Sequence, residues 1–216
     1  MEVKEKIKDK VIELFLLKSC KDITMDEVAR QIGISKRTLY ENYANKEEML
    51  YSILIEYVQR GQEEYKEKVM GENNVLCGFI VGTLYHIKMA SQVKFQRLYE
   101  LKQYYPSIFD SLFSSHKEFE EKFVRNLLSN SQKEGYLIKQ ISIEMIIKLL
   151  YLNVYNISIT TLNNEKSSDE MFKFYLIHLF IILRGLCTEK GLKIFNDFCS
   201  KTFKKKDFEN INIKFE

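Results

Sequence analysis

The stretch from Thr24 to Leu50 constrains the fold more than any other, because it encodes two short helices around a glycine and a third, separately capped helix. Thr24 can accept a hydrogen bond from the Glu27 backbone N–H, while the Glu27 carboxylate returns to the Thr24 amide. A helix is therefore expected to begin at about Met25. Its apolar positions recur at helical spacing: Val28, Ala29 and Ile32.

Gly33 is expected to end this helix, since glycine adopts a positive φ without steric cost. Ser35 offers a new N-cap two residues later, so the connection is as short as that of a helix-turn-helix unit. The second helix is predicted over Lys36–Tyr43, with Leu39 turned inward. A third helix follows Asn45, and Glu48 can complete a second capping box there.

The second helix carries polar and basic residues at its N-terminal end: Lys36, Arg37, Thr38 and Tyr40. When such a helix enters the major groove of DNA, this end meets the base edges. Lys46 lies in the first turn of the third helix, where a helix N-terminus and an ammonium together favour a phosphate. Capped helices around a glycine also occur in proteins that do not bind DNA, so spacing alone leaves both interpretations open.

The run GISKRTLYENYANKEEML, residues 33–50, resembles the helix-turn-helix pattern of TetR-type transcriptional regulators. The resemblance implies an all-α fold, with an N-terminal three-helix DNA-binding domain over residues 1–45 and its helix-turn-helix at about 24–43. Residues 46–216 would form a larger helical domain for effector binding and dimerisation. The resemblance also implies phosphate or groove contacts at Thr24, Lys36, Tyr40 and Lys46, and base-edge contacts at Ser35, Arg37 and Thr38.

The chain departs from the family pattern at several positions. Tyr43 replaces the usual phenylalanine, Asn42 a common histidine or tyrosine, and Ala44 a frequent proline. Ser19-Cys20 stands where the family has a glycine and an aromatic residue. The missing glycine leaves the shape of the loop from Lys18 to Ile23 undetermined.

Composition agrees with a helical DNA-binding protein but does not prove one. The 216 residues include one proline and eight glycines, which favours an almost entirely helical chain. The net charge is only +3, and the basic and acidic residues of the first fifty positions balance. Affinity for DNA must therefore come from the local placement of Lys36, Arg37 and Lys46.

Further helices are predicted on both sides of the motif. The first is marked by apolar residues at i, i+4, i+7 and i+8: Ile7, Val11, Leu14 and Phe15. A long helix is predicted from Lys46 to about Met70. This helix would couple the DNA-binding domain to the rest of the chain. Later helices are expected over 73–91, around Phe95 to Leu101, and from Pro106 to Gly135.

Two late segments, Ile143–Leu162 and Phe172–Leu186, are apolar nearly all the way round and need burial on two sides. One side can pack on the domain and the other on a second copy, forming a four-helix bundle in a homodimer. The candidate interface residues are Ile147, Tyr151 and Ile181. Such a dimer would place two recognition helices roughly 34 Å apart on a palindromic operator in double-stranded DNA. Polar residues interrupt both segments, so no membrane span is expected.

The middle of the chain is rich in aromatic residues, which either fill a core or line a cavity. TetR-like proteins commonly hold a small effector there, so the resemblance implies a hydrophobic or aromatic effector and a repressor that it releases. The polar residues that could orient it are His86, Tyr99, His116, Asn153, Tyr155 and Asn156. A filled core would favour instead a DNA binder acting through a protein partner. A helical oligomer without a DNA role is a third possibility, which leaves the exposed basic residues unexplained.

No catalytic or metal-binding pattern stands out. The three histidines lie on separate predicted helices, and the four cysteines show no C-x-x-C spacing. Neither an enzyme nor a cofactor or metal site is therefore expected. The N-terminus lacks an apolar signal segment, and unpaired cysteines suit a reducing compartment, so a cytoplasmic location is expected.

Overall fold

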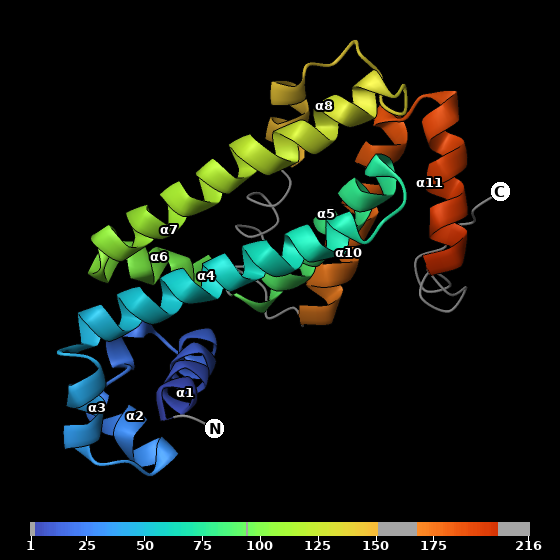
Figure 1. Cartoon of the computed structure of the whole chain (residues 1–216). Helices are drawn as coiled ribbons and strands as arrows, with labels where there is room; N and C mark the ends of the chain where they lie inside the picture. Colours follow the sequence, from blue (N-terminus) through green and yellow to red (C-terminus); the bar gives the residue numbers. More distant parts are fainter. Residues whose placement is uncertain (1–2, 94, 151–167, 203–216) are drawn as a thin grey trace. The chain divides into compact units, whose positions relative to one another are not determined.

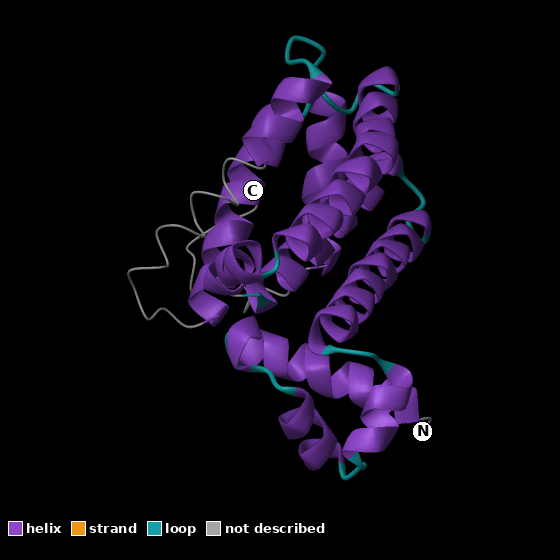
Figure 2. Cartoon of the chain, turned by 90° about the vertical axis from the view of Figure 1, so that its left-hand side faces the viewer, coloured by secondary structure: helices purple, strands orange, loops and turns teal. Residues whose placement is uncertain are grey.

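The structure, a computed structural model, describes residues 3–93, 95–150 and 168–202 (Figure 1). Its described regular structure is helical, apart from an isolated bridge between Leu137 and Cys187 (Figure 2). This confirms the all-α fold. The chain divides into two compact units, Met1–Glu63 with Gln92–Glu118 and Glu64–Ser91 with Phe119–Glu216. The boundary between residues 45 and 46 that the family resemblance implies stays a prediction.

The first unit begins with α1 (Val3–Leu17), a 3-10 turn η1 (Cys20–Asp22), α2 (Met25–Ile32) and α3 (Lys36–Asn42). It also contains the first part of α4 (Lys46–Met70), α6 (Phe95–Tyr104) and nearly all of α7 (Pro106–Phe119). The 3-10 turn defines the loop that the sequence left open. Ser19 stabilises this turn, because its side chain accepts a hydrogen bond from the Lys21 backbone N–H.

One hydrophobic core joins the helices of the first unit. The predicted apolar face of α1 is confirmed, since Ile7, Val11, Leu14 and Phe15 are all buried. Leu39 of α3 packs in the same cluster, together with Leu101 of α6 and Ile108 of α7. Full burial of one such side chain contributes about 1.5–3 kcal/mol. The helix-turn-helix is therefore stabilised by helices that lie far from it in the sequence.

The second unit contains the rest of α4, most of α5 (Val75–Gln92) and α8 (Arg125–Lys133). The sequence predicted one helix from Pro106 to Gly135. In the structure α7 and α8 occupy this range, and a π-helical turn, η2 (Glu120–Val124), joins them. Gly135 has a φ of 76°, as expected for the residue that ends such a helix.

Later helices complete the second unit. Residues 143–150 are helical, whereas the remainder of the predicted segment to Leu162 includes positions outside the described residues. The second predicted segment lies within α10 (Ser168–Leu186). No helix was predicted beyond residue 186, yet α11 (Glu189–Thr202) follows there. Its buried residues recur at helical spacing: Gly191, Phe195, Phe198 and Cys199.

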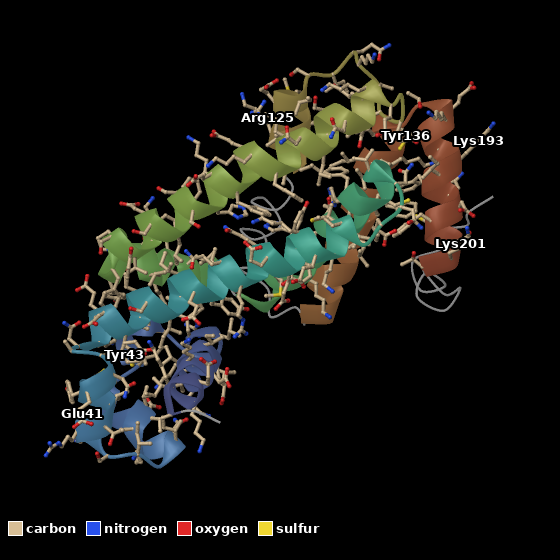
Figure 3. The ribbon with its side chains drawn as sticks, viewed as in Figure 1. Glu41, Tyr43, Arg125, Tyr136, Lys193 and Lys201 are labelled. Atoms are coloured by element: carbon tan, nitrogen blue, oxygen red, sulfur yellow. The ribbon has the colours of Figure 1, made fainter. Side chains whose placement is uncertain are left out.

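Hydrogen bonds connect the start of α11 to the turn after α8. Thr188 Oγ1 donates to the carbonyl of Gly135 at 2.6 Å, and Lys190 Nζ donates to the carbonyl of Glu134 at 2.9 Å. Gly191 approaches so closely that a Cβ there would lie 2.0 Å from the Tyr136 carbonyl oxygen (Tyr136 is labelled in Figure 3). This contact requires glycine at residue 191 for steric reasons.

A bilayer-spanning helix would need a long, almost uncharged apolar stretch, and none of the helices in the described ranges provides one.

Candidate nucleic-acid interface

The N-terminus of α2 is capped as the sequence predicted, but only in one direction. Thr24 Oγ1 accepts from the Glu27 backbone N–H at 3.1 Å. The Glu27 carboxylate, expected to return to the Thr24 amide, instead accepts from Lys18 Nζ and from Gln31 Nε2. Lys18 directly follows α1, so this carboxylate connects α2 to the residue after α1 instead of closing a local capping box.

The turn of the helix-turn-helix is fixed by a Schellman motif. Gly33 has φ 71° and ψ 35°, and its N–H donates to the carbonyl of Arg30 at 3.3 Å. The Ile34 N–H donates to the carbonyl of Ala29 at 3.0 Å. Ser35 Oγ then accepts from the Thr38 backbone N–H at 3.0 Å and starts α3. Together, these bonds set the direction in which α3 leaves the turn.

One face of α3 is buried and the other is exposed. Leu39 is completely buried and anchors the helix to the core of the first unit. Lys36, Arg37 and Tyr40 are exposed, as is the capping residue Ser35, whereas Thr38 is half-buried. The residues that the family resemblance assigns to DNA thus lie mainly on the solvent side of the unit.

Both cations of α3 form ion pairs with carboxylates of the same unit. Lys36 Nζ lies 2.5 Å from Asp26 Oδ2 of α2, and Arg37 Nε lies 3.0 Å from Glu41 Oε1, one turn later on α3. Exposed pairs of this kind contribute little to stability, so a DNA phosphate can displace Asp26 from Lys36 at small cost.

Lys46 begins α4 and makes internal contacts. Its Nζ donates to the carbonyl of Lys21 at 2.8 Å and lies 5.6 Å from the centre of the Tyr105 ring. Partial burial lowers the pKa of the Lys46 ammonium. An ammonium has three N–H donors, so contact with a phosphate remains compatible with the bond to Lys21.

The second capping box is present with a shifted partner. Asn45 Oδ1 accepts from the Glu48 backbone N–H at 2.9 Å, as expected. The Glu48 carboxylate accepts from the backbone N–H of Ala44 at 2.9 Å and so completes the box one residue earlier. Ala44, where the family often has proline, can make this bond because it retains its N–H.

Tyr43 follows α3 and points into the core (labelled in Figure 3). It is 3% exposed, and its hydroxyl has no hydrogen-bond partner among the described residues. Burial raises the pKa of this phenol. The chain therefore carries a polar atom in the core at a position where the resembling family usually has phenylalanine.

The predicted effector-orienting residues are not gathered into one described cavity. His86 lies on α5 in the second unit, whereas Tyr99 and His116 lie on α6 and α7 in the first. Tyr99 is 62% exposed, and burial lowers the pKa of His116. The other three, Asn153, Tyr155 and Asn156, lie outside the described residues.

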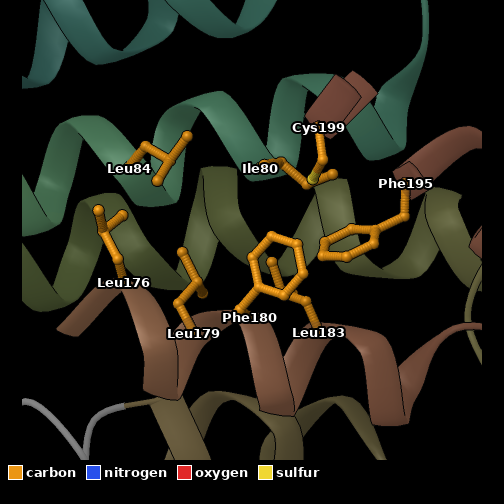
Figure 4. Close-up of a pocket in the computed structure, with 8 residues that line it drawn as sticks. All are labelled: Ile80, Leu84, Leu176, Leu179, Phe180, Leu183, Phe195 and Cys199. Atoms are coloured by element: carbon orange, nitrogen blue, oxygen red, sulfur yellow. The ribbon is translucent and has the colours of Figure 1, made fainter. Parts of the chain in front are cut away.

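A pocket in the second unit is lined instead by apolar side chains of α5, α10 and α11 (Figure 4). Its eight lining residues are Ile80, Leu84, Leu176, Leu179, Phe180, Leu183, Phe195 and Cys199. Its volume of about 10 Å³ is close to what one water molecule requires. Sequence reasoning missed this pocket, although the spacing from Leu176 to Leu183 marks one face of a helix.

The candidate dimer residues fall in different environments. Ile147 is 9% exposed and belongs to the core of its own unit, whereas Ile181 of α10 is 66% exposed. Tyr151 lies outside the described residues. Of the three, Ile181 is the one whose described side chain is available to a second copy.

In the described ranges, no group of three or more His, Cys, Asp or Glu side chains is arranged so that it could hold a metal ion. All four cysteines are free thiols. Burial raises the pKa of Cys199, which lines the pocket, to about 12. This thiol therefore stays protonated at neutral pH, where it is a poor nucleophile.

Comparison with known proteins supports the resemblance. Residues 9–53 match the family of bacterial regulatory proteins described as the tetR family. No curated protein sequence matches the chain. Among solved structures, a TetR-family regulator from Marinobacter aquaeolei VT8 is similar with 17% identity and a TM-score of 0.69, over 92% of this chain and 99% of that one.

Two further solved structures share the fold. FadR from Bacillus subtilis in complex with stearoyl-CoA has 14% identity and a TM-score of 0.65, over 84% of this chain and 98% of that one. The ketosteroid transcriptional regulator KstR2 of Mycobacterium tuberculosis has 17% identity and a TM-score of 0.58, over 87% and 96%. Residues 9–53 thus match the tetR family of bacterial regulatory proteins, and the fold of the chain is similar to that of solved TetR-family regulators.

Proposed function

We propose that the chain is a cytoplasmic, homodimeric repressor that binds a palindromic operator and leaves it when a hydrophobic effector binds. The observation that carries the DNA part is α3 itself, which Ser35 caps and Leu39 anchors, so that its basic residues face solvent. Ser35, Arg37 and Thr38 would meet base edges. Thr24, Lys36, Tyr40 and Lys46 would contact phosphates or the groove wall.

Dimerisation follows from the length of DNA that one helix can read. A single recognition helix of seven residues covers too few bases to select one operator, whereas a two-fold dimer reads two half-sites. Ile181, exposed on α10, supports placing the interface on the late helices. The two copies of α3 would then lie roughly 34 Å apart, in successive major grooves.

The effector part rests on the apolar pocket between α5, α10 and α11. Side chains without polar groups select an aliphatic or aromatic ligand, such as an acyl chain or a steroid skeleton. The complex of FadR with stearoyl-CoA and the naming of KstR2 as a ketosteroid regulator support this ligand class. The pocket must widen to admit a ligand. An effector that binds the released state about a hundredfold better shifts the equilibrium by about 2.7 kcal/mol.

A second candidate is a regulator that acts through a protein partner. The small volume of the described pocket favours it, because a filled core leaves no room for an effector. The partner would then dock on the helices of the second unit. The two candidates share the DNA-binding part and differ only in what releases the protein from its operator.

Selection from a random DNA pool by the purified protein tests the DNA part. A palindrome with two half-sites about one helical turn apart is the expected result, and enrichment of no common sequence would refute operator binding. Fatty acids of graded length, their coenzyme A thioesters and steroids are then added to the complex with the selected DNA. Release by one of these classes supports the effector. If all fail while a cell extract releases the protein and protease treatment abolishes that effect, the partner candidate replaces it.

A further inference from the structure

Arg37 and Glu41 form an exposed pair on the outer face of α3, within the helix proposed to read DNA. Their side chains are 89% and 59% exposed, and Arg37 Nε lies 3.0 Å from Glu41 Oε1. Leu39, two residues from each, is completely buried on the opposite side of the helix. Both charged groups therefore project away from the core on one side of α3.

This pair is badly placed to stabilise the helix. The N-terminus of a helix favours negative charge and the C-terminus positive charge. α3 has the reverse, with Arg37 in its first turn and Glu41 near its end. The order within the pair is also the weaker one, because an i,i+4 pair is better with the acidic residue first. Since local charges oppose the helix here, a function explains the pair better than helix stability does.

The hydrogen bond between Arg37 and Glu41 leaves the end of the guanidinium available to a DNA base. Glu41 accepts from Nε, so the bond does not use the two terminal nitrogens of the guanidinium. Those two nitrogens form the planar fork that contacts O6 and N7 of guanine. Holding Nε also restricts a side chain that would otherwise sample many rotamers, so less freedom is lost when guanine binds.

The carboxylate also acts against the wrong DNA. A negative charge on the groove-facing side is repelled by every phosphate, whatever the sequence. On an operator with guanine at the right position, the favourable contact of the oriented Arg37 with that base offsets this repulsion. On other sequences Arg37 has no guanine to contact, so the repulsion is not offset. Glu41 would thus weaken binding to unrelated DNA more than binding to the operator.

We propose that Glu41 is a specificity-determining residue, which orients Arg37 toward a guanine of the operator and lowers affinity for sequences that lack it. This inference rests on the proposed operator binding. It adds a residue that the family resemblance did not assign to DNA.

The test compares base preferences of the wild type, Glu41→Gln, Arg37→Ala and the double variant by selection from a random DNA pool, with titrations of the selected operator and of unrelated DNA. Glu41→Gln should bind unrelated DNA more tightly and lose about fivefold or more of its preference for one guanine, within the range that a bidentate contact supplies. Arg37→Ala should lose preference at the same position. In the Arg37→Ala background, Glu41→Gln should change that preference no further.

Asp197→Asn provides a matched control, because Asp197 forms a similar exposed i,i+4 pair with Lys201 on α11. It should leave every base preference unchanged. If Glu41→Gln raises affinity for all sequences by the same factor, or if Arg37→Ala changes no preference, the inference is wrong. A wild type that enriches no common motif refutes operator binding and this inference together, whereas a wild-type motif unchanged by Glu41→Gln refutes the inference alone.

Discussion

Replacing Tyr43 with phenylalanine should stabilise this protein, although it removes a polar group from the core. The Tyr43 hydroxyl is buried and has no hydrogen-bond partner among the described residues. On folding it gives up its hydrogen bonds to water and gains none in return. A buried, unsatisfied group of this kind costs about 1–3 kcal/mol.

The size of the effect on melting follows from the length of the chain. For proteins of about this size, 1 kcal/mol shifts the melting temperature by roughly 2–4 °C. Tyr43→Phe should therefore raise it by roughly 2 °C at the least and by as much as about 12 °C. Phenylalanine fills the space of the ring, so no cavity is created to offset this gain.

Thermal unfolding followed by circular dichroism measures the change, and urea titration converts it to a free energy of unfolding. Tyr51→Phe is the matched control, since Tyr51 is 45% exposed and its hydroxyl can be solvated. It should leave the melting temperature nearly unchanged. Operator affinity should also stay the same in Tyr43→Phe, because this side chain points into the core. A lower melting temperature in Tyr43→Phe than in the wild type would show that the hydroxyl is satisfied after all.

Three other changes test the remaining parts of the argument. Gly191→Ala should destabilise the protein by about 1–3 kcal/mol, because the added Cβ would lie 2.0 Å from the Tyr136 carbonyl oxygen. Gly185→Ala, where a Cβ meets nothing within 4 Å, should be neutral or stabilising, and equal urea midpoints for the two variants would contradict the close approach. Lys46→Ala should reduce the slope of log affinity against log salt by about 0.9 if it contacts one phosphate, and an unchanged slope would remove that role. Ile181→Asp should yield folded monomers in light scattering, and a dimer of native mass would place the interface elsewhere. Ile147→Lys should instead unfold the protein, because Ile147 is only 9% exposed and lies in the core of its own unit.

The helix-turn-helix could be predicted from the sequence because its determinants are local. Gly33 ends α2 and Ser35 begins α3 through hydrogen bonds to residues at most five positions away. The apolar face of α1 could also be predicted, since the buried residues on one side of a helix recur every three or four positions. At these positions, the backbone groups of one helix end are satisfied by their immediate neighbours, so no knowledge of the remaining chain is needed.

The partners of several side chains could not be predicted from the sequence, because they come from distant parts of the chain. Glu27 was expected to close its own capping box, but Lys18, which directly follows α1, donates to its carboxylate instead. The contact of Lys46 with Tyr105 joins residues far apart in sequence, as does the pocket where Ile80 faces Phe180 and Phe195. α11 was overlooked in the sequence even though its buried residues recur at helical spacing.

Local sequence therefore predicts the ends of the two helices of the helix-turn-helix and the residues that they expose. Three features depend on the folded chain: the pairing of the cations, the burial of Tyr43 without a partner among the described residues, and the lining of the apolar pocket. The two groups of features differ in the sequence separation over which their interactions act. Backbone capping and helical periodicity act within one or two turns, whereas ion pairs between elements and cavities depend on chain segments that meet only when the core packs.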